Sequence, residues 1–408
     1  MLVPGNVYHF NPSCDFAIGN GSANWQPNKL LQKMERDLAV LPLYFAKPTD
    51  YILVEDKPDD AFYQRLGLLG IQLPVFISKQ EISLPSPVIK PLNRLLPWGW
   101  SPAEHKLLAP LKPFCSDKFQ QSPVFQWKAE HKALASRRFA LRMLKEIIRT
   151  ADEKIFIAPT LTGEICSSKQ EIEKLLARWE KIMVKIPWSS SGRGLQTITK
   201  TPVHPKVWEK ILGSISSQGF VIVEPLLNKV LDFAFQFEIK NGIVNYLGES
   251  RFTTDKKGQY TGNQLNGFST VVSGEIIDFI MSAKKILVPL LVKTLKTSEI
   301  ATSYEGKFGI DTLVFLDEYN MLKINPCLEI NMRHNMGLLS LFLERLLLPG
   351  TKGVFRTWYD TQKRFTDFTN EMEKRYPLMI KGQKIKKGYF PLTHFSHNSR
   401  FGAYLLVE

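Results

Sequence analysis

Residues 233–249, FAFQFEIKNGIVNYLGE, place an Asn-Gly pair between two runs rich in aromatic and β-branched side chains. The tightest hairpin turns need a positive φ at both central residues, which Asn and Gly tolerate well. The pair Asn241-Gly242 therefore predicts an antiparallel hairpin. A second hairpin is expected at 309–333, GIDTLVFLDEYNMLKINPCLEINMR, with a helix at 275–295 between the two.

The first 120 residues follow a different rhythm, because short apolar runs alternate with helix-like segments. The runs at 6–10 and 51–55 are typical of strands, and 28–41 carries apolar residues at helical spacing. This alternation predicts parallel strands covered by helices. Gly19 and Gly21 do not complete a dinucleotide-binding fingerprint, so we expect turn residues there. The proline-rich stretch 84–102 is expected to be irregular, and 128–149 to be one long helix.

Length and composition indicate a folded protein of several lobes. A chain of 408 residues exceeds what one hydrophobic core usually supports. No targeting segment or span is visible, so a cytoplasmic protein is expected. The four cysteines are scattered without a CxxC pair, which argues against a zinc site and a disulfide framework. The net charge of +14 favours anionic ligands. The densest basic run, at 381–387, lacks interleaved aromatics, so nucleic acid is not an expected partner.

The segment 185–195, KIPWSSSGRGL, lies between two predicted strands at 181–187 and 195–200. It is not a P-loop, because GxxxxGK[ST] is absent. Its glycines let backbone N–H groups curl round an anion, its serines add donors and its arginine adds charge. The candidate phosphate contacts are Ser189, Ser190, Ser191, Gly192, Arg193 and Gly194. A solvated hairpin loop is the simpler alternative for this segment alone, so the phosphate interpretation depends on the residues that accompany it.

Three polar residues alternate along the last predicted strand. Glu329, Asn331 and Arg333 occupy every second position, so strand periodicity directs them to one face. If the hairpin turn is centred near Asn320, Asp311 faces Glu329, and Pro326 predicts a bulge. Opposed carboxylates repel unless a positive group lies between them, and Mg²⁺ prefers such oxygen ligands. The alternative is a structural cluster in which Arg333 neutralises Glu329, which would leave Asn331 no reason to share the face.

Two further carboxylates lie in or after the apolar run FVIVEP at 220–225. Glu224 ends this run, where a buried carboxylate requires a partner. An adenine amino group or a ribose hydroxyl would satisfy it, and Asp232 is the matching candidate for the ribose. For both residues a helix cap or an ion pair with a lysine is the alternative.

Taken together in this order, these elements resemble the ATP-grasp superfamily of carboxylate–amine ligases. The resemblance covers roughly residues 137–337. It rests on a basic helix SRRFALRML, the strand and loop VKIPWSSSGRGL, the run VIVEP, and GIDTLVF followed by LEINMR. The region before about residue 120 is similar to the Rossmann-like domain that precedes the grasp in this family. The spacing between Asp311 and Glu329 is wider than in compact relatives, which indicates a longer turn or a bulge.

The resemblance implies a role for each candidate residue. Lys185 would contact the nucleotide, the serine-glycine loop would close over the β- and γ-phosphates, and Arg333 would stabilise the transferring phosphoryl group. Arg137 would be the family's first nucleotide-contacting basic residue, with Arg138 as the alternative. The remaining implied roles are the adenine edge for Glu224, the ribose for Asp232, and Mg²⁺, with Mn²⁺ as a second choice, for Asp311, Glu329 and Asn331.

The expected fold is α/β with α+β lobes, in which a Rossmann-like N-terminal domain precedes a two-lobed ATP-grasp fold. The expected divisions are 1–120, 121–223, 224–350 and a helical, then irregular, extension at 351–408. The resemblance implies an ATP-dependent ligase that joins a small-molecule carboxylate to an amine through an acyl phosphate. The alternatives are a small-molecule kinase and a non-catalytic nucleotide-binding protein. Substrate identity and oligomeric state are left open.

Overall fold

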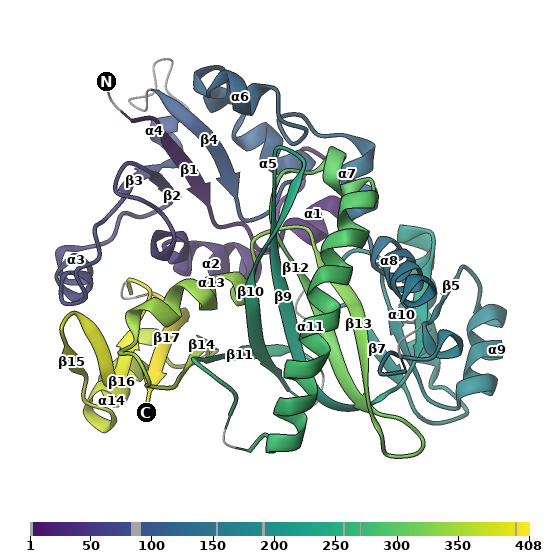
Figure 1. The fold of residues 1–408 in the computed structure, drawn as a ribbon. Coiled ribbons are helices and arrows are strands. Elements are labelled where there is room, and N and C mark those ends of the chain that lie inside the picture. Colours follow the sequence, from purple (N-terminus) through teal and green to yellow (C-terminus); the bar gives the residue numbers. More distant parts are fainter. Residues whose placement is uncertain are drawn as a thin grey trace.

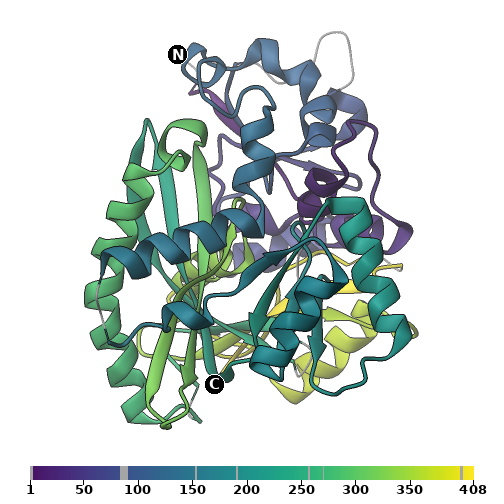
Figure 2. The same ribbon diagram turned by 90° about the vertical axis from the view of Figure 1, so that its right-hand side faces the viewer.

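The computed structural model describes residues 3–82, 91–151, 154–189, 192–255, 258–269, 271–395 and 398–408. The strands in these ranges form three sheets, of four, four and nine strands. Figure 1 shows the first sheet at one end of the molecule and the long strands of the nine-stranded sheet through its centre. Figure 2 shows the other four-stranded sheet and its helices beside these long strands.

The N-terminal sheet is parallel, with strand order β3-β2-β1-β4. This confirms the alternating pattern of strands and helices expected from the sequence. Its elements are β1 (Gly5–His9), α1 (Cys14–Asn20), α2 (Lys29–Asp37), a 3₁₀ turn (Leu41–Tyr44), β2 (Tyr51–Val54), α3 (Asp60–Gly67), β3 (Val75–Ser78), α4 (Lys79–Ile82), β4 (Leu92–Pro97) and α5 (Pro102–Leu107). Two short turns follow, a 3₁₀ turn (Ala109–Phe114) and α6 (Asp117–Gln120).

The proline-rich stretch departs from the expectation. Residues 83–90 lie outside the described ranges, but Leu92–Pro97 is a regular strand, β4, paired with β1. The prediction of an irregular segment was therefore wrong for these residues. Pro91 and Pro97 lie just before the strand and at its last position, and β4 is an edge strand, where a missing backbone donor is tolerated.

The second sheet is antiparallel, with order β5-β8-β6-β7. It consists of β5 (Glu164–Cys166), β6 (Ile182–Lys185), β7 (Leu195–Ile198) and β8 (Val221–Pro225), and α9 (Lys169–Trp179) and α10 (Pro205–Gln218) pack on it. The serine-glycine loop joins β6 to β7, as expected. Because β8 ends at Pro225, the expected division after residue 223 falls within this strand.

The single long helix expected at 128–149 is instead two helices. These are α7 (Ala129–Leu134) and α8 (Arg137–Thr150). Ser136 breaks the segment because its side chain accepts a hydrogen bond from the Arg138 N–H and caps α8. A 3₁₀ turn (Pro159–Leu161) follows. The cap orients the first residue of α8, Arg137, toward the candidate site.

The nine-stranded sheet has the order β13-β12-β9-β10-β11-β14-β17-β16-β15. Its first five strands along the chain are β9 (Asn228–Lys240), β10 (Ile243–Thr254), β11 (Tyr260–Leu265), β12 (Gly306–Leu316) and β13 (Leu322–Asn331). The Asn-Gly hairpin is confirmed, with φ of 53° at Asn241 and 73° at Gly242. The second hairpin is confirmed as well, since β12 pairs with β13. The intervening helices are α11 (Gly274–Thr297) and α12 (Ile300–Ser303).

Alternation along β9 explains how this sheet can carry both a core and a site. Phe233, Phe235 and Phe237 point into the largest hydrophobic core, which also contains Leu287 and Leu291 of α11. The intervening positions of β9 therefore face away from α11. Figure 1 shows α11 lying along the sheet, and it is the opposite face that carries the candidate site.

The segment after Gly350 is not irregular, which corrects the expectation. Strands β14 (Gly353–Tyr359), β15 (Met379–Lys381), β16 (Lys384–Pro391) and β17 (Phe401–Val407) extend the nine-stranded sheet through pairing of β14 with β11. The helix α13 (Met336–Leu343) and a 3₁₀ turn (Glu344–Leu346) precede this segment, and α14 (Phe365–Arg375) lies within it. None of the helices in the described ranges combines the length and apolarity needed to cross a bilayer.

Candidate active site

Two carboxylates face each other on neighbouring strands. Asp311 of β12 pairs directly with Glu329 of β13, and the register shifts between Asp311 and Leu313, as the bulge expected at Pro326 requires. Burial, and then the charge of Glu329, raise the pKa of Asp311 to about 7, while a hydrogen bond with Asn331 acts in the opposite direction. A divalent cation there would relieve the repulsion between the two carboxylates.

The oxygen atoms at this point of the sheet suit a hard metal ion. Asp311, Glu329 and Asn331 supply carboxylate and amide oxygens, the ligand type that Mg²⁺ prefers. Within the described ranges, no three His, Cys, Asp or Glu side chains are grouped so that they could hold a metal ion. The candidate ligands are therefore two carboxylates and one amide. A metal ion held by these three would need phosphate oxygens or water as its further ligands.

Arg137 connects the carboxylate pair to the serine-glycine loop. Its Nη2 lies 2.8 Å from Glu329 Oε1, and its Nη1 donates to Ser189 Oγ at 2.6 Å and to the Ile186 carbonyl at 2.5 Å. Arg138 instead lies over the ring of Phe220, 3.9 Å from its centroid. Of the two candidate arginines, only Arg137 contacts the other candidate residues. Glu329 forms its ion pair with Arg137, whereas Arg333 forms one with Asp15.

The described part of the loop is closely packed. Ser189 is buried, and Arg193 is exposed. Gly192 has φ of +73°, and a Cβ added to it would lie 2.6 Å from the carbonyl oxygen of Gly258 in the β10–β11 connection. Gly194 is buried. Ser190 and Ser191 lie outside the described residues. The loop therefore packs against the nine-stranded sheet at a position where a side chain would not fit.

Lys185 and Glu224 form a nearly buried ion pair. Lys185 Nζ lies 2.6 Å from Glu224 Oε2, and the side chains are 8% and 15% exposed. The two residues come from the adjacent strands β6 and β8. Electrostatic effects of Lys185, Glu224 and Asp311 all act on the thiol of Cys327, whose pKa is raised mainly by burial. The ion pair therefore lies in the same region as the carboxylate pair.

Asp232 forms an ion pair with a lysine, which was one of the alternatives that the sequence left open for this residue. Its Oδ2 accepts hydrogen bonds from Lys229 Nζ at 2.7 Å and from Thr254 Oγ1 at 3.0 Å. Its charge raises the pKa of Asp311, although it is the last of the contributions. Asp232 therefore lies on the site face, but its carboxylate is already hydrogen bonded.

Arg333 is held by a residue that the sequence analysis did not select. Its Nε donates to Asp15 Oδ2 of α1 at 2.8 Å, and its Nη2 donates to Asn331 Oδ1 at 3.0 Å. Burial raises the pKa of Asp15. The pair joins the N-terminal sheet to the carboxylate hairpin. A carboxylate in the apolar stretch after the first strand was the only available signal for Asp15.

No protein-family sequence model matches the chain. No curated protein sequence matches it either. Its structure is similar to that of biotin carboxylase from Campylobacter jejuni in complex with beta-gamma-ATP, with a TM-score of 0.54 and 13% identity over 100% of this chain and 88% of that chain. It is also similar to N5-carboxyaminoimidazole ribonucleotide synthetase in an ADP complex, with a TM-score of 0.51 and 9% identity over 100% and 94%.

The chain has the ATP-grasp fold. This confirms the fold class inferred from the sequence. In this fold, the loop after β6, the ion pair between β6 and β8 and the hairpin β12–β13 are brought together, although more than a hundred residues separate the loop from the hairpin in the sequence. Among the described candidates, Asp232 and Arg193 have side chains that form no hydrogen bond or ion pair with the others, because Asp232 is bonded to Lys229 and Thr254 and Arg193 is exposed.

Proposed function

We propose that this protein is an Mg²⁺-dependent ATP-grasp ligase that joins a carboxylate to an amine through an acyl phosphate. The observation that carries the proposal is the bridge from Arg137 to both Ser189 and Glu329. Arg137 thereby connects a donor-rich loop to an acidic hairpin. In the proposed complex these two parts would bind opposite sides of a nucleoside triphosphate. The two solved structures of similar fold are enzymes described in complex with nucleotides.

The nucleotide would lie between the sheet of β5–β8 and the face of the nine-stranded sheet opposite α11. Lys185 would contact its phosphates, and loop N–H groups with the Ser189 hydroxyl would cover the β- and γ-phosphates. Glu224 would meet the adenine and Asp232 the ribose, which requires each carboxylate to exchange part of its lysine pairing for the ligand. We propose that the boundary between the two lobes lies after β8, which ends at Pro225, and not after residue 223.

Asp311, Glu329 and Asn331 would hold Mg²⁺. The metal, when bound, neutralises charge on the β- and γ-phosphates. Deprotonation of Asp311 accompanies its use as a ligand, because its pKa of about 7 lies well above that of an ordinary aspartate. Arg137 would then share Glu329 with the metal.

The chemistry needs positioning and neutralised charge more than a covalent nucleophile from the protein. A substrate carboxylate oxygen attacks the γ-phosphorus, giving an acyl phosphate and ADP. Arg333, oriented by Asp15 and Asn331, would stabilise the charge that develops on the transferred group. The loop over the phosphates would exclude water from the acyl phosphate. An amine then displaces phosphate.

A substrate screen tests this function. Small-molecule carboxylates, with anionic ones included because the chain carries a net charge of +14, are paired with amines, ATP and Mg²⁺, and phosphate release is measured. A ligase needs both partners, whereas a small-molecule kinase would form a stable phosphorylated product from one. Glu329→Gln should abolish the turnover. If Glu329→Gln leaves turnover unchanged, the metal assignment is wrong. Nucleotide binding without any turnover would favour the non-catalytic alternative.

A further inference from the structure

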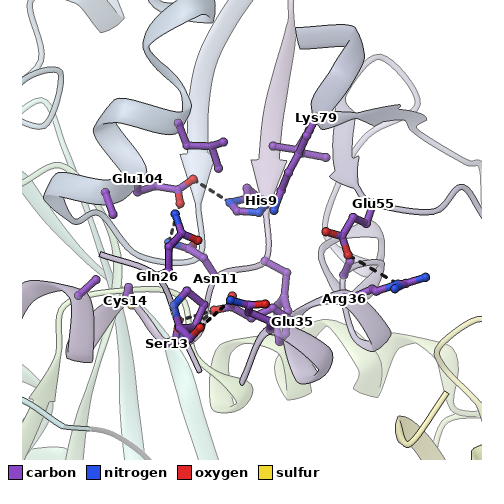
Figure 3. A pocket seen from close by; sticks show the side chains of 18 of the residues that line it. His9, Asn11, Ser13, Cys14, Gln26, Glu35, Arg36, Glu55, Lys79 and Glu104 are labelled. Carbon is purple, nitrogen blue, oxygen red and sulfur yellow. Dashed lines mark hydrogen bonds and ion pairs between the residues drawn. The ribbon is translucent and has the colours of Figure 1, made fainter. Parts of the chain in front are cut away.

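A cavity of about 600 Å³ lies at the carboxyl end of the N-terminal parallel sheet. It is lined by residues at or after the ends of β1, β2 and β4, by the segment 25–27, by one side of α2 and by Lys79 after β3. Its charged lining residues are Glu35, Glu55, Glu104, Lys29, Lys33, Arg36 and Lys79. Figure 3 shows its polar side chains, among them His9, Asn11, Ser13, Glu35 and Glu104. None of them belongs to the nucleotide and metal site described above. Ligands of open α/β sheets bind at this end of the strands.

His9 and Glu104 form an oriented pair in this cavity. His9 Nδ1 lies 2.8 Å from Glu104 Oε1, and the side chains are 11% and 5% exposed. Glu104 Oε2 accepts a hydrogen bond from Asn11 Nδ2 at 3.0 Å, and Asn11 is fixed by two bonds to the Gly99 backbone. A carboxylate only accepts, so Nδ1 carries the proton. In the neutral ring the lone pair is then on Nε2, and His9 is one of the residues that line the cavity.

Glu35 supplies a negative charge to the same cavity. Its Oε1 accepts hydrogen bonds from Ser13 N at 3.1 Å and Ser13 Oγ at 2.5 Å. No lysine or arginine of the described residues forms an ion pair with it. Burial raises the pKa of Glu35, and a positive charge on His9 would lower it. An ammonium group bound at Glu35 would therefore gain a desolvated carboxylate partner.

The cavity adjoins the proposed phosphoryl-transfer site. Cys14 lines the cavity, and the next residue, Asp15, holds Arg333. Gly99 lies between Cys14 and Arg333. A larger residue would not fit there, because a Cβ at this position would lie 2.3 Å from Cys14 Sγ and 3.1 Å from Arg333 Cβ. Gly99 thus packs between a residue that lines the cavity, Cys14, and the residue assigned to the acyl phosphate, Arg333.

We propose that this cavity binds the amine co-substrate, with Glu35 holding its ammonium group and His9 Nε2 acting as the general base that deprotonates it. The assignment rests on the proposed ligase function. It requires that the amine binds in its protonated form and becomes the nucleophile once it has lost a proton. His9 takes one proton from the ammonium, and Glu104 stabilises the imidazolium. The amine lone pair forms the C–N bond to the acyl carbon, and the C–O bond to phosphate breaks. The second proton leaves with the phosphate, and His9 releases its proton to water.

Two nucleophiles separate this role from the rest of the reaction. Hydroxylamine is largely unprotonated at neutral pH and needs no base, so hydroxamate formation reports the acyl phosphate alone. With a carboxylate that supports hydroxamate formation, the ratio of amide to hydroxamate product should fall about 10²-fold or more in His9→Gln. His204→Gln, a change at an exposed histidine that caps α10, is the matched control and should keep the wild-type ratio. Glu35→Gln should raise the KM for the amine about tenfold with little change in kcat.

An unchanged ratio in His9→Gln would overturn the assignment. If no carboxylate supports hydroxamate formation in the wild type, the ligase proposal itself fails, and the role of His9 fails with it. The wild-type protein gives a second measurement that does not depend on the folding of variants. In histidine labelled with ¹⁵N, the neutral form of the His9 ring should carry its proton on Nδ1 and none on Nε2. A proton on Nε2 with a bare Nδ1 would overturn the proposal.

Discussion

Nη2 of Arg137 lies 2.8 Å from Oε1 of Glu329, while Nη1 of the same guanidinium donates to Ser189 Oγ at 2.6 Å. One side chain at the start of α8 thus contacts both the loop after β6 and the strand β13. The two contacts couple the position of the loop to the charge of the hairpin. Any ligand that binds between them must displace or share these hydrogen bonds.

Arg137→Met should remove this coupling. Ser189 loses its donor and Glu329 its cation, and because Glu329 is 25% exposed, water replaces part of the loss. We expect the free energy of unfolding to fall by about 2 kcal/mol and the KM for ATP to rise about tenfold. Arg138→Met is the matched control, because this neighbour is exposed and lies over Phe220. Equal effects of both variants on the KM would contradict the assignment.

Asp311 should make stability depend on pH in the absence of metal. Its pKa is about 7 in the folded protein and 3.8 ordinarily, so between these values the folded state binds a proton that the unfolded state has lost. Stability should therefore fall as pH rises through this window, and the penalty should be complete above about pH 7. Asp311→Asn should remove this slope, raising the Tm at pH 8 in EDTA by several degrees.

The same variant should lose Mg²⁺ affinity, which calorimetry in the presence of a non-hydrolysable nucleotide can measure. Glu318→Gln, an exposed change in the turn of the same hairpin, serves as the control for both experiments. If the wild type and Asp311→Asn show the same dependence of the melting temperature on pH from pH 4 to pH 7 in EDTA, Asp311 is ionised throughout this range.

Lys185 and Glu224 should show strong coupling in a double-mutant cycle. Lys185→Met leaves a nearly buried carboxylate without its cation and should destabilise the protein by about 3 kcal/mol. Adding Glu224→Gln should recover more than half of this loss, because the uncompensated charge is then gone. Lys181→Met, at an exposed lysine just before the same strand, should change the urea midpoint little. Additive effects of Lys185→Met and Glu224→Gln would argue against the pair.

Gly192 should resist substitution for reasons of backbone and space. Alanine there meets φ of +73° and places its Cβ 2.6 Å from the Gly258 carbonyl oxygen, so the loop must move away from the β10–β11 connection. Phosphate release should fall at least tenfold in Gly192→Ala. Gly213→Ala in α10, where nothing lies within 4 Å of the new Cβ, should instead stabilise the protein by about 0.5–1 kcal/mol. Full activity in Gly192→Ala would mean that the loop does not close on the nucleotide.

Local sequence patterns were sufficient to predict the two hairpins and the cross-strand pairing of Asp311 with Glu329. That register follows from the position of the turn, where Asn320 has φ of 59°, and from the bulge near Pro326. Both signals lie within about twenty residues of the pair. The break at Ser136 was missed because apolar spacing continues across it, although the serine itself is a typical cap.

Contacts between distant segments could not be predicted in this way. Asp15 and Arg333 are 318 positions apart, and neither has a local sequence pattern that identifies the other. The same is true of His9 and Glu104. They meet because β1 and β4 are parallel and end at the same edge of the sheet, and Glu104 lies in the helix that follows β4. Strands β14–β17 escaped notice because their pairing partners depend on the whole sheet and not on their own alternation.

The last strand, β17, occupies an interior place in the nine-stranded sheet, between β14 and β16. During synthesis, therefore, neither β14 nor β16 can pair with β17 until residues 401–407 have left the ribosome. Until then β14 exposes an unpaired edge to solvent and to other nascent chains. A premature stop near residue 400 would leave the hairpin β12–β13, at the other end of the sheet, intact and would expose the edge of β14 to aggregation.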